Sequence, residues 1–278
     1  ERDPRRMIPE MATLAPLVGL LLASGAFAGL LAGMLGVGGG IVHVPAFFFV
    51  FTTLGYGGPQ LMQVCLATSL AAIVITSLRS VAAHARRGAV DWSILKRWAP
   101  GIAGGAVIGV IVAARVRSEP LEALFGVVAT LVGLYLLFGR PEWRLGSAMP
   151  VGPARAALSS LVGFLSVLMG IGGGTFGVPL MTLFGISMHS AVATSAGFGA
   201  LIAVPSVIAF LLVDIAGAPP MTVGAINLPA FLVAVSMTMV TAPIGARIAH
   251  GLNALTLRRA FAVFILVVAA TMVMAAFG

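Results

Sequence analysis

The sequence has 278 residues, of which 60% are hydrophobic and only 9% are charged, and its mean hydropathy is +1.11. A soluble domain carries about 25% charged residues, and a soluble core of this length could not hide so much apolar surface. The composition therefore excludes an ordinary soluble protein and indicates an all-α, polytopic membrane protein with about seven to ten spans.

The net charge of +8 comes from sixteen lysines and arginines against eight acidic residues. The basic residues lie almost entirely in short connections or at the ends of apolar runs, which is typical of membrane topology. We therefore expect these basic residues to orient the chain in the lipid bilayer, and we expect no binding to nucleic acid. Cys65 is the only cysteine in the sequence, which excludes an intrachain disulfide.

Five apolar runs make up the first half, and one of them is too short to cross a bilayer. The run 41–54 would form a helix of about 21 Å, against a hydrocarbon core of about 30 Å. We expect it to start in mid-membrane as a half-helix, after the cluster Gly36–Gly40 has broken the preceding span. The five runs are 14–35, 41–54, 61–83, 92–114 and 121–138.

The second half repeats this plan after a linker at 139–153, which holds Arg140, Arg144 and three prolines. We predict an N-terminal transmembrane repeat at 1–145 and a C-terminal transmembrane repeat at 146–278. No acidic residue is expected in the middle of a span. The apolar runs of this half are 156–169, 176–184, 191–213, 227–248 and 257–277.

Matching motifs at nearly constant spacing indicate an internal duplication into two pseudo-symmetric repeats. The repeats are parallel if each crosses the membrane four times, and inverted if each glycine hairpin is re-entrant. Both schemes place ten lysines and arginines on one side and five on the other when Arg79 is left out, so charge does not choose between them. The matches are Gly36–Gly40 with Gly170–Gly174, Val44-Pro45 with Val178-Pro179, Ala67-Thr68-Ser69 with Ala193-Thr194-Ser195, and Gly88–Asp91 with Gly224–Asn227.

Each glycine cluster opens a short helix, and such a helix start can bind an anion. Unpaired backbone N–H groups and the positive end of the helix dipole meet there, and glycine lets a ligand approach the backbone closely. The alternative is close helix packing, which glycines often serve in membranes. Two matched clusters favour the anion site. Its candidate residues are Gly38, Gly39, Gly40, Gly172, Gly173 and Gly174.

Polar side chains in and near the spans could complete the shell of an anion. Hydroxyl groups can donate to an oxyanion, although Ser and Thr also bond to carbonyls of their own helix. Cys65 lies four residues before Ser69 and shares a helix face with it. Arg79 is either a substrate counter-ion or a cation that snorkels to the interface, and His43 is a candidate proton carrier. The candidates are Thr68, Ser69, Thr194, Ser195, Cys65, Arg79 and His43.

Motifs for other chemistry are missing from the sequence. It contains no Walker sequence, no His-Glu-x-x-His and no CxxC, and no carboxylate pair lies in a predicted span. We therefore expect no enzymatic activity, no metal and no cofactor.

The doubled glycine motif with its Val-Pro, together with the doubled Ala-Thr-Ser, resembles the sulfite exporter TauE/SafE family, also described as sulfonate permeases. The resemblance runs from about Leu14 to Phe277. It implies a multi-pass carrier of a bacterial-type inner membrane that moves small sulfur-containing anions such as sulfite, sulfoacetate or related organosulfonates. Arg79 and His43 are not among the residues that carry the resemblance, so their roles rest on the reasoning from the residues alone.

Together these observations predict an exporter that works by alternating access around the glycine site. The proton gradient or the membrane potential could drive it. An anion channel and a non-transporting membrane scaffold are the alternatives. Alanine at Gly39 and Gly173 should destabilise a scaffold but leave a carrier folded without its anion site. The oligomeric state is left open.

Overall fold

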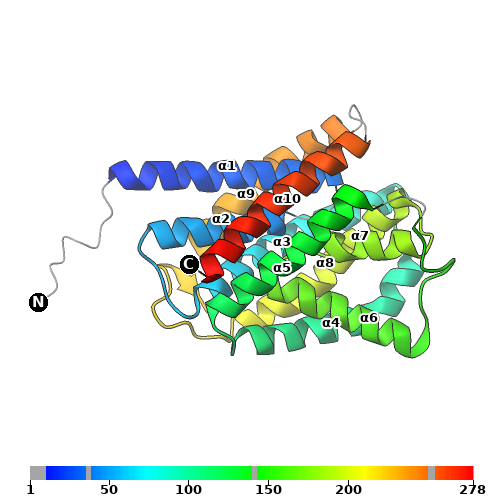
Figure 1. Ribbon diagram of the computed structural model, residues 1–278, viewed down its shortest axis with the longest axis horizontal. Coiled ribbons are helices and arrows are strands. Elements are labelled where there is room, and N and C mark those ends of the chain that lie inside the picture. Colours follow the sequence, from blue (N-terminus) through cyan, green and yellow to red (C-terminus); the bar gives the residue numbers. More distant parts are fainter. Residues whose placement is uncertain (1–10, 36–38, 140–142, 250–253, 278) are drawn as a thin grey trace, which may run out of the picture.

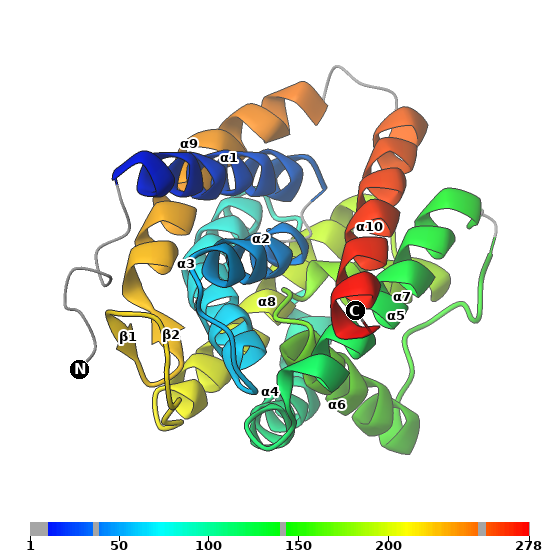
Figure 2. The same ribbon diagram turned by 60° about the vertical axis from the view of Figure 1, so that its left-hand side comes forward.

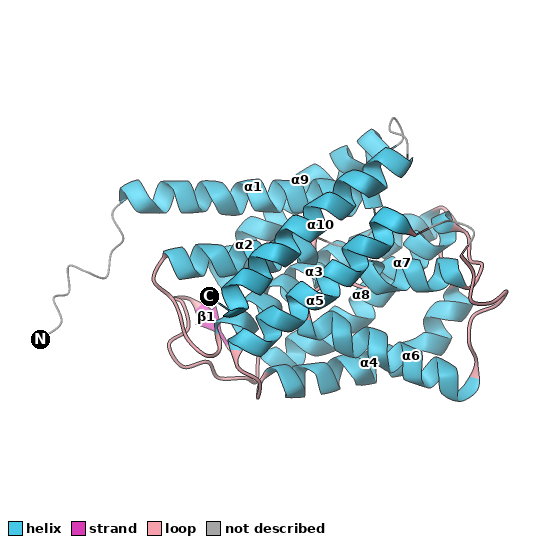
Figure 3. Ribbon diagram, viewed as in Figure 1, coloured by secondary structure: helices cyan, strands magenta, loops and turns pink. Residues whose placement is uncertain are grey.

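The computed structural model describes residues 11–35, 39–139, 143–249 and 254–277, and these residues form a bundle of helices (Figure 1). The all-α, polytopic prediction is confirmed, with one short hairpin of β1 (Thr222–Val223) and β2 (Ile226–Asn227) beside the helices (Figure 3). The helices are α1 (Met11–Leu35), α2 (Gly40–Thr53), α3 (Leu61–Arg86), α4 (Trp92–Ala113), α5 (Ser118–Phe138), α6 (Gly152–Leu168), α7 (Gly174–Leu183), α8 (Met188–Phe210), α9 (Leu228–Ala249) and α10 (Ala254–Phe277).

The lengths of the helices agree with a membrane protein that contains half-helices. Within the described ranges, five helices are long and apolar enough to cross a bilayer, namely α3, α4, α5, α8 and the stretch Leu228–Gly245 of α9. The half-helices α2 and α7 have 14 and 10 residues and begin at the glycine clusters, as predicted. Ahead of α7, Gly170 has a φ of +59°, a left-handed conformation that glycine adopts without strain, and the chain reverses there.

The helices pair reciprocally between the two repeats. Helix α1 packs against α9 and α6 packs against α4, while α3 pairs with α8 and α5 with α10. Figure 2 shows α1 with α9, α10 with α5, and α4 with α6 around the central α3 and α8. Because α6–α10 are the repeat equivalents of α1–α5, this pattern is a pseudo-twofold arrangement. The division of the chain at residue 145 stays a prediction, since the two repeats interlock through these pairs.

Glycines at equivalent positions of the two repeats allow the paired helices to pack closely. In α4, a Cβ on Gly109 would lie 3.1 Å from the carbonyl oxygen of Phe164 in α6. In α9, a Cβ on Gly245 would overlap the carbonyl oxygen of Leu30 in α1. Gly245 is the repeat equivalent of Gly109, and Phe164 that of Leu30. Small residues let helix backbones approach in membranes, so the duplication preserves one interhelical contact in both halves.

The repeats are inverted, which resolves the choice that charge left open. Figure 1 shows α1 beginning and α10 ending at the same end of the bundle, and α2 returning to this end. The backbone N–H of Ser118 donates to the carbonyl of Pro59 at 2.8 Å there, which joins the start of α5 to the turn after α2. At the opposite end, the N–H of Leu145 donates to Leu183 O at 2.8 Å, which joins the linker to the end of α7. Each half therefore carries one re-entrant glycine hairpin and three crossings. We call the two ends the termini end and the linker end.

The buried interior is centred on α3. Every residue of α3 from Leu61 to Ile73 is buried. The outer helices instead present large apolar side chains at their exposed surface, for example Ile108, Leu131 and Leu232. An apolar exterior of this kind is expected for spans in contact with lipid.

Candidate functional site

The start of α2 meets the second glycine bend at the centre of the bundle. A Cβ on Gly40, the first residue of α2, would lie 2.5 Å from the carbonyl oxygen of Gly170 and 2.8 Å from the Cα of Ile171. Residues more than a hundred positions apart are thus in backbone contact, which only glycine at position 40 permits. The fold brings the start of α2 and the bend before α7 to one place.

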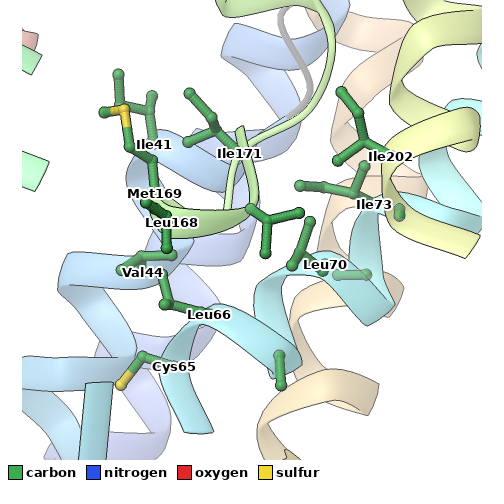
Figure 4. Close-up of a cluster of buried hydrophobic side chains, with 14 of the residues drawn as sticks. Ile41, Val44, Cys65, Leu66, Leu70, Ile73, Leu168, Met169, Ile171 and Ile202 are labelled. Atoms are coloured by element: carbon green, nitrogen blue, oxygen red, sulfur yellow. The ribbon is translucent and has the colours of Figure 1, made fainter. Parts of the chain in front are cut away.

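Apolar side chains enclose this meeting point. Figure 4 shows Ile171 between Ile41 on one side and Ile73 and Ile202 on the other, with Leu66 of α3 below them. Ile41, Ile73 and Ile171 are fully or almost fully buried. A charge at this point would lose its hydration, so it would need hydrogen bonds from the protein in place of water.

The starts of α2 and α7 are sources of such hydrogen bonds. Helix α2 is preceded by Gly39 and helix α7 by Gly173, and glycine has no side chain that could cap a helix. No side-chain hydrogen bond caps either helix start. The first four N–H groups of a helix have no partner within it, and the positive end of the helix dipole lies there. Gly40, Gly174 and Thr175 at these starts are all buried. Two buried, uncapped helix starts are suited to hold a negative charge.

The four predicted hydroxyls divide into two classes by their bonds. The Oγ of Ser69 donates to Gly170 O at 2.7 Å, and the Oγ of Ser195 donates to Val192 O at 2.9 Å. Both serines therefore use their proton inside the protein, and Ser69 fixes the second glycine bend. Thr68 and Thr194 instead accept hydrogen bonds, from the backbone N–H groups of Asn227 and Asp91. A hydroxyl that accepts one bond still has its proton to donate.

Several buried polar atoms near the bends have no hydrogen-bond partner among the described residues. They include the Nδ1 of His43, the Oγ1 of Thr175 and the Oγ of Ser166. His43 lies beside Gly39, stacks on Phe47 with ring centroids 5.6 Å apart, and places its Nε2 3.5 Å from the Oγ1 of Thr238. Buried polar atoms usually find a partner, so unpaired ones next to two helix starts mark a place where a ligand could bond.

The other predicted site residues are placed differently. Gly38 lies outside the described residues. Cys65 is buried on α3, one turn before Ser69. Arg79 is exposed on the outside of α3, where its Nη1 lies 3.0 Å from the Sδ of Met239. The structure thus brings Gly39, Gly40, Gly172–Gly174, His43, Ser69 and Ser195 around the bends. It leaves Arg79 at the surface, and it places the Thr68 and Thr194 hydroxyls against the starts of α9 and α4.

Glu122 lies inside α5 and is only 4% exposed. It belongs to the predicted run 121–138 and lies near the start of the helix, not in its middle. Helix α5 begins at Ser118 rather than at Leu121, and the Ser118 side chain accepts a hydrogen bond from Met62 N at the start of α3. The burial of Glu122 was not predicted from the sequence.

Sequence reasoning also missed Thr175 and Ser166, and it missed the roles of Asp91 and Asn227. The repeat alignment contained the equivalence of Asp91 and Asn227, but only the folded chain shows that they bond to the two threonines. Among the described residues, no group of three or more His, Cys, Asp or Glu side chains lies together as metal ligands would.

Comparison with known proteins identifies the family. The family model described as sulfite exporter TauE/SafE matches residues 21–272. A probable membrane transporter protein of Haemophilus influenzae is 32% identical over 257 residues, which cover 91% of this chain and 97% of the relative. The probable membrane transporter protein YunE of Bacillus subtilis is 30% identical over 201 residues, 63% of this chain and 71% of its own. A probable membrane transporter protein of Methanocaldococcus jannaschii is 26% identical over 202 residues, which cover 72% and 75% of the two chains.

No solved structure matches the chain. The family match extends from within α1 to within α10 and includes both glycine bends. This multi-pass membrane protein, with its two inverted repeats and its paired glycine bends, belongs to the sulfite exporter TauE/SafE family.

Proposed function

We propose that this chain transports small sulfur-containing anions, such as sulfite or organosulfonates, across a bacterial-type inner membrane. One observation carries the proposal: two buried helix starts without a side-chain cap meet at the centre of the bundle, at Gly40 and at the bend before Gly174. Family membership and the names of the relatives support transport as the activity.

The anion would be held by backbone N–H groups from the first turns of α2 and α7. Thr68 and Thr194 belong to the neighbouring helices α3 and α8, and each has a hydroxyl proton that it could give to an oxyanion. Thr175 adds a buried hydroxyl without a partner among the described residues, in the first turn of α7. These donors bear no net charge, which suits a carrier that must release its substrate after binding it.

Alternating access would come from movement of the inverted halves about this centre. In the present arrangement the bends are in backbone contact, so an anion would enter only after α2 and the α6–α7 bend separate. The serine bond from Ser69 to Gly170 crosses this contact and would have to break or move with the bend. We therefore assign the structure to a closed state of the transport cycle.

The distribution of charge favours one orientation in the membrane. The termini end has Arg115 and Arg117 as its described basic residues, together with Glu119 and Asp214. Basic residues collect on the cytoplasmic side of membrane proteins, so the linker end would face the cytoplasm. A positive cytoplasmic mouth would also attract anions for export. The described basic residues of the linker end are Arg86, Arg87, Lys96, Arg97, Arg144, Arg155, Arg247 and Arg259.

A thermal-shift panel on purified protein tests the proposal, because a ligand that binds the folded state raises its apparent stability. The panel contains sulfite, sulfoacetate, taurine, thiosulfate, sulfate and acetate. We expect a sulfur oxyanion to raise the melting temperature and acetate to leave it unchanged. No response to any of the sulfur compounds would contradict the proposal.

The variant Thr175→Val keeps shape while removing an unpaired hydroxyl, so it should melt like the wild type but lose part of the ligand shift. Its matched control is Thr130→Val on α5, where the hydroxyl bonds to Gly126 O of its own helix at 2.7 Å. This control should keep the full ligand shift.

Transport in liposomes separates the alternatives. Saturable counterflow of labelled sulfoacetate is expected from a carrier, since one site is exposed alternately to each side. An anion channel would instead give currents that rise linearly with concentration over a wetted path. A scaffold would show neither activity.

A further inference from the structure

Glu122 is a buried carboxyl group in a membrane-spanning helix without a countercharge. It is 4% exposed, and in the part of the chain that the structure describes it has neither a hydrogen bond nor an ion pair. Glu119, one turn earlier on α5, is the contrast: its side chain is 50% exposed and pairs with Arg117 at 3.1 Å. Ionisable residues inside the membrane are costly and commonly serve transport or proton transfer.

A second unsatisfied polar group lies beside the connection from α4 to α5. On α3, the Nε2 of Gln63 donates to the carbonyls of Ala113 and Val116, while its Oε1 is buried without a hydrogen-bond partner among the described residues. Cys65, also on α3, is buried and lies within electrostatic range of the Glu122 carboxylate. The junction of α3, α4 and α5 therefore holds a carboxyl group and an amide oxygen that have no hydrogen-bond partner in the described part of the chain.

Glu122 is not required by the repeat architecture. The glycine bends, the two threonines and the Asp91–Asn227 positions occur in both halves, as a shared fold demands. The position equivalent to Glu122 in the second half holds Arg258 in the sequence. A feature that the duplicated scaffold lacks in one copy points to a functional rather than an architectural role.

A single face of α3 leads from Glu122 to the glycine bends. Cys65 lies within electrostatic range of Glu122 and precedes Ser69 by one helical turn, so the Cys65 and Ser69 side chains lie on one face of α3. Ser69 in turn donates to Gly170 at the second bend. A change of charge at Glu122 would thus be separated from the proposed anion site by about one turn of α3.

We propose that Glu122 is the protonation site that couples proton movement to anion transport. Resting on the proposed function, this inference adds the coupling ion to it. The carboxylate takes up a proton from the termini end, becomes neutral, and gives the proton up again when the cycle opens to the other end. Uptake and release balance, and no further reactant is needed.

The groups that could disturb this titration are few. Glu119 acts on the Glu122 carboxyl from its own helix, Cys65 lies within electrostatic range of it on α3, and Arg117 pairs with Glu119 at the surface. Arg115 lies after the end of α4. Helix α10 packs on α5 with its stretch 261–277, which contains no titratable residue.

The test compares Glu122→Gln with the matched control Glu119→Gln in proteoliposomes, using radiolabelled sulfoacetate. This substrate is fully ionised at neutral pH and carries no proton of its own. Counterflow at equal pH measures exchange, while accumulation under an imposed pH gradient measures coupling. We expect Glu122→Gln to keep counterflow and its thermal transition but to accumulate no more than without a gradient. Glu119→Gln should behave like the wild type.

Gradient-driven accumulation by Glu122→Gln at the wild-type level would overturn the inference. If that variant does not fold, the wild type decides, because addition of sulfoacetate must then change the internal pH reported by a trapped dye. A wild type that performs counterflow without this pH change overturns the coupling role alone. A wild type without counterflow overturns the proposed function, and the coupling role with it.

Discussion

The hydroxyl of Thr68 accepts a hydrogen bond from the backbone N–H of Asn227 at 3.0 Å, and Thr194 accepts one from Asp91 at 2.9 Å. Thr194 is the repeat equivalent of Thr68, and Asn227 that of Asp91, so each half supplies the acceptor for the other. Asp91 caps α4 through its bonds from Ser93 N and Ile94 N, and Asn227 caps α9 through its bond from Ala230 N. The two threonines thus hold the capped start of a helix in the opposite repeat.

Replacing either threonine by valine should destabilise the protein to a similar extent. The change leaves a buried backbone N–H without an acceptor, which costs about 1–3 kcal/mol. Thermal unfolding in detergent should therefore give a lower melting temperature for Thr68→Val and Thr194→Val. Serine at the same positions keeps the acceptor and should restore most of the loss. Equal melting of Thr68→Val and wild type would contradict the bond.

Alanine at Gly173 should destabilise the protein, whereas alanine at Gly104 should not. A Cβ on Gly173 would overlap the Cβ of Phe198 and lie 2.6 Å from the backbone nitrogen of Gly199, and overpacking of this kind costs about 1–3 kcal/mol. Gly104 of α4 has nothing within 4 Å of such a Cβ, so alanine there should gain up to about 1 kcal/mol of helix propensity. Thermal unfolding measures both changes. Similar melting of the two variants would contradict the packing at Gly173.

These contacts also show that one experiment suggested by the sequence cannot separate the two roles of the glycines. Alanine at Gly39 and Gly173 was expected to separate a packing role from anion binding. A Cβ on Gly39 would lie 2.7 Å from the Cβ of Ala28, so both positions carry packing whatever else they do. Thr175→Val is the better probe, because its hydroxyl has no partner in the described part of the chain.

The sequence was sufficient for features that depend on short stretches of chain. Three adjacent glycines in an apolar run break a helix locally, and a run of fourteen residues is too short to span a bilayer, so the half-helix α2 followed from both. Which helices pair was not predictable, because α1 meets α9 through contacts between residues more than two hundred positions apart. The hydrogen bonds of Thr68 and Thr194 were not predictable for the same reason, because their partners also lie far away in the sequence.

The burial of Glu122 was not predictable for a related reason. The predicted run 121–138 placed Glu122 at the very start of a span, but α5 begins at Ser118, whose side chain bonds to Met62 N at the start of α3 and to Gly58 O. Glu122 therefore lies more than one turn inside the helix. For Ser69 and Ser195, the sequence predicted the positions but not the hydrogen bonds. Only the folded chain reveals that Ser69 bonds across to the second bend while Ser195 bonds within its own helix.

This difference between the serines predicts an asymmetry. Ser69→Ala removes the donor to Gly170 O, a bond between residues of opposite repeats, and should lower stability by about 1 kcal/mol. Ser195→Ala removes only a bond within α8 and should have a smaller effect, since such bonds compete with the helix rather than join elements. Thermal unfolding of the two variants side by side checks this. A larger loss for Ser195→Ala would contradict the assigned role of Ser69.

The proposed orientation predicts which end of the bundle can be labelled from outside the cell. Ser147 is exposed near Gly185, just after α7, at the linker end, and Ala216 is exposed beside the turn 56–58, after α2, at the termini end. Single cysteines at these positions, in a Cys65→Ala background that removes the native thiol, can be tested with a membrane-impermeant maleimide. In intact spheroplasts, Ala216→Cys should react and Ser147→Cys should react only after permeabilisation, because the basic linker end would face the cytoplasm. The reverse pattern would place the positive mouth outside, and the same electrostatic attraction would then favour uptake of anions over their export.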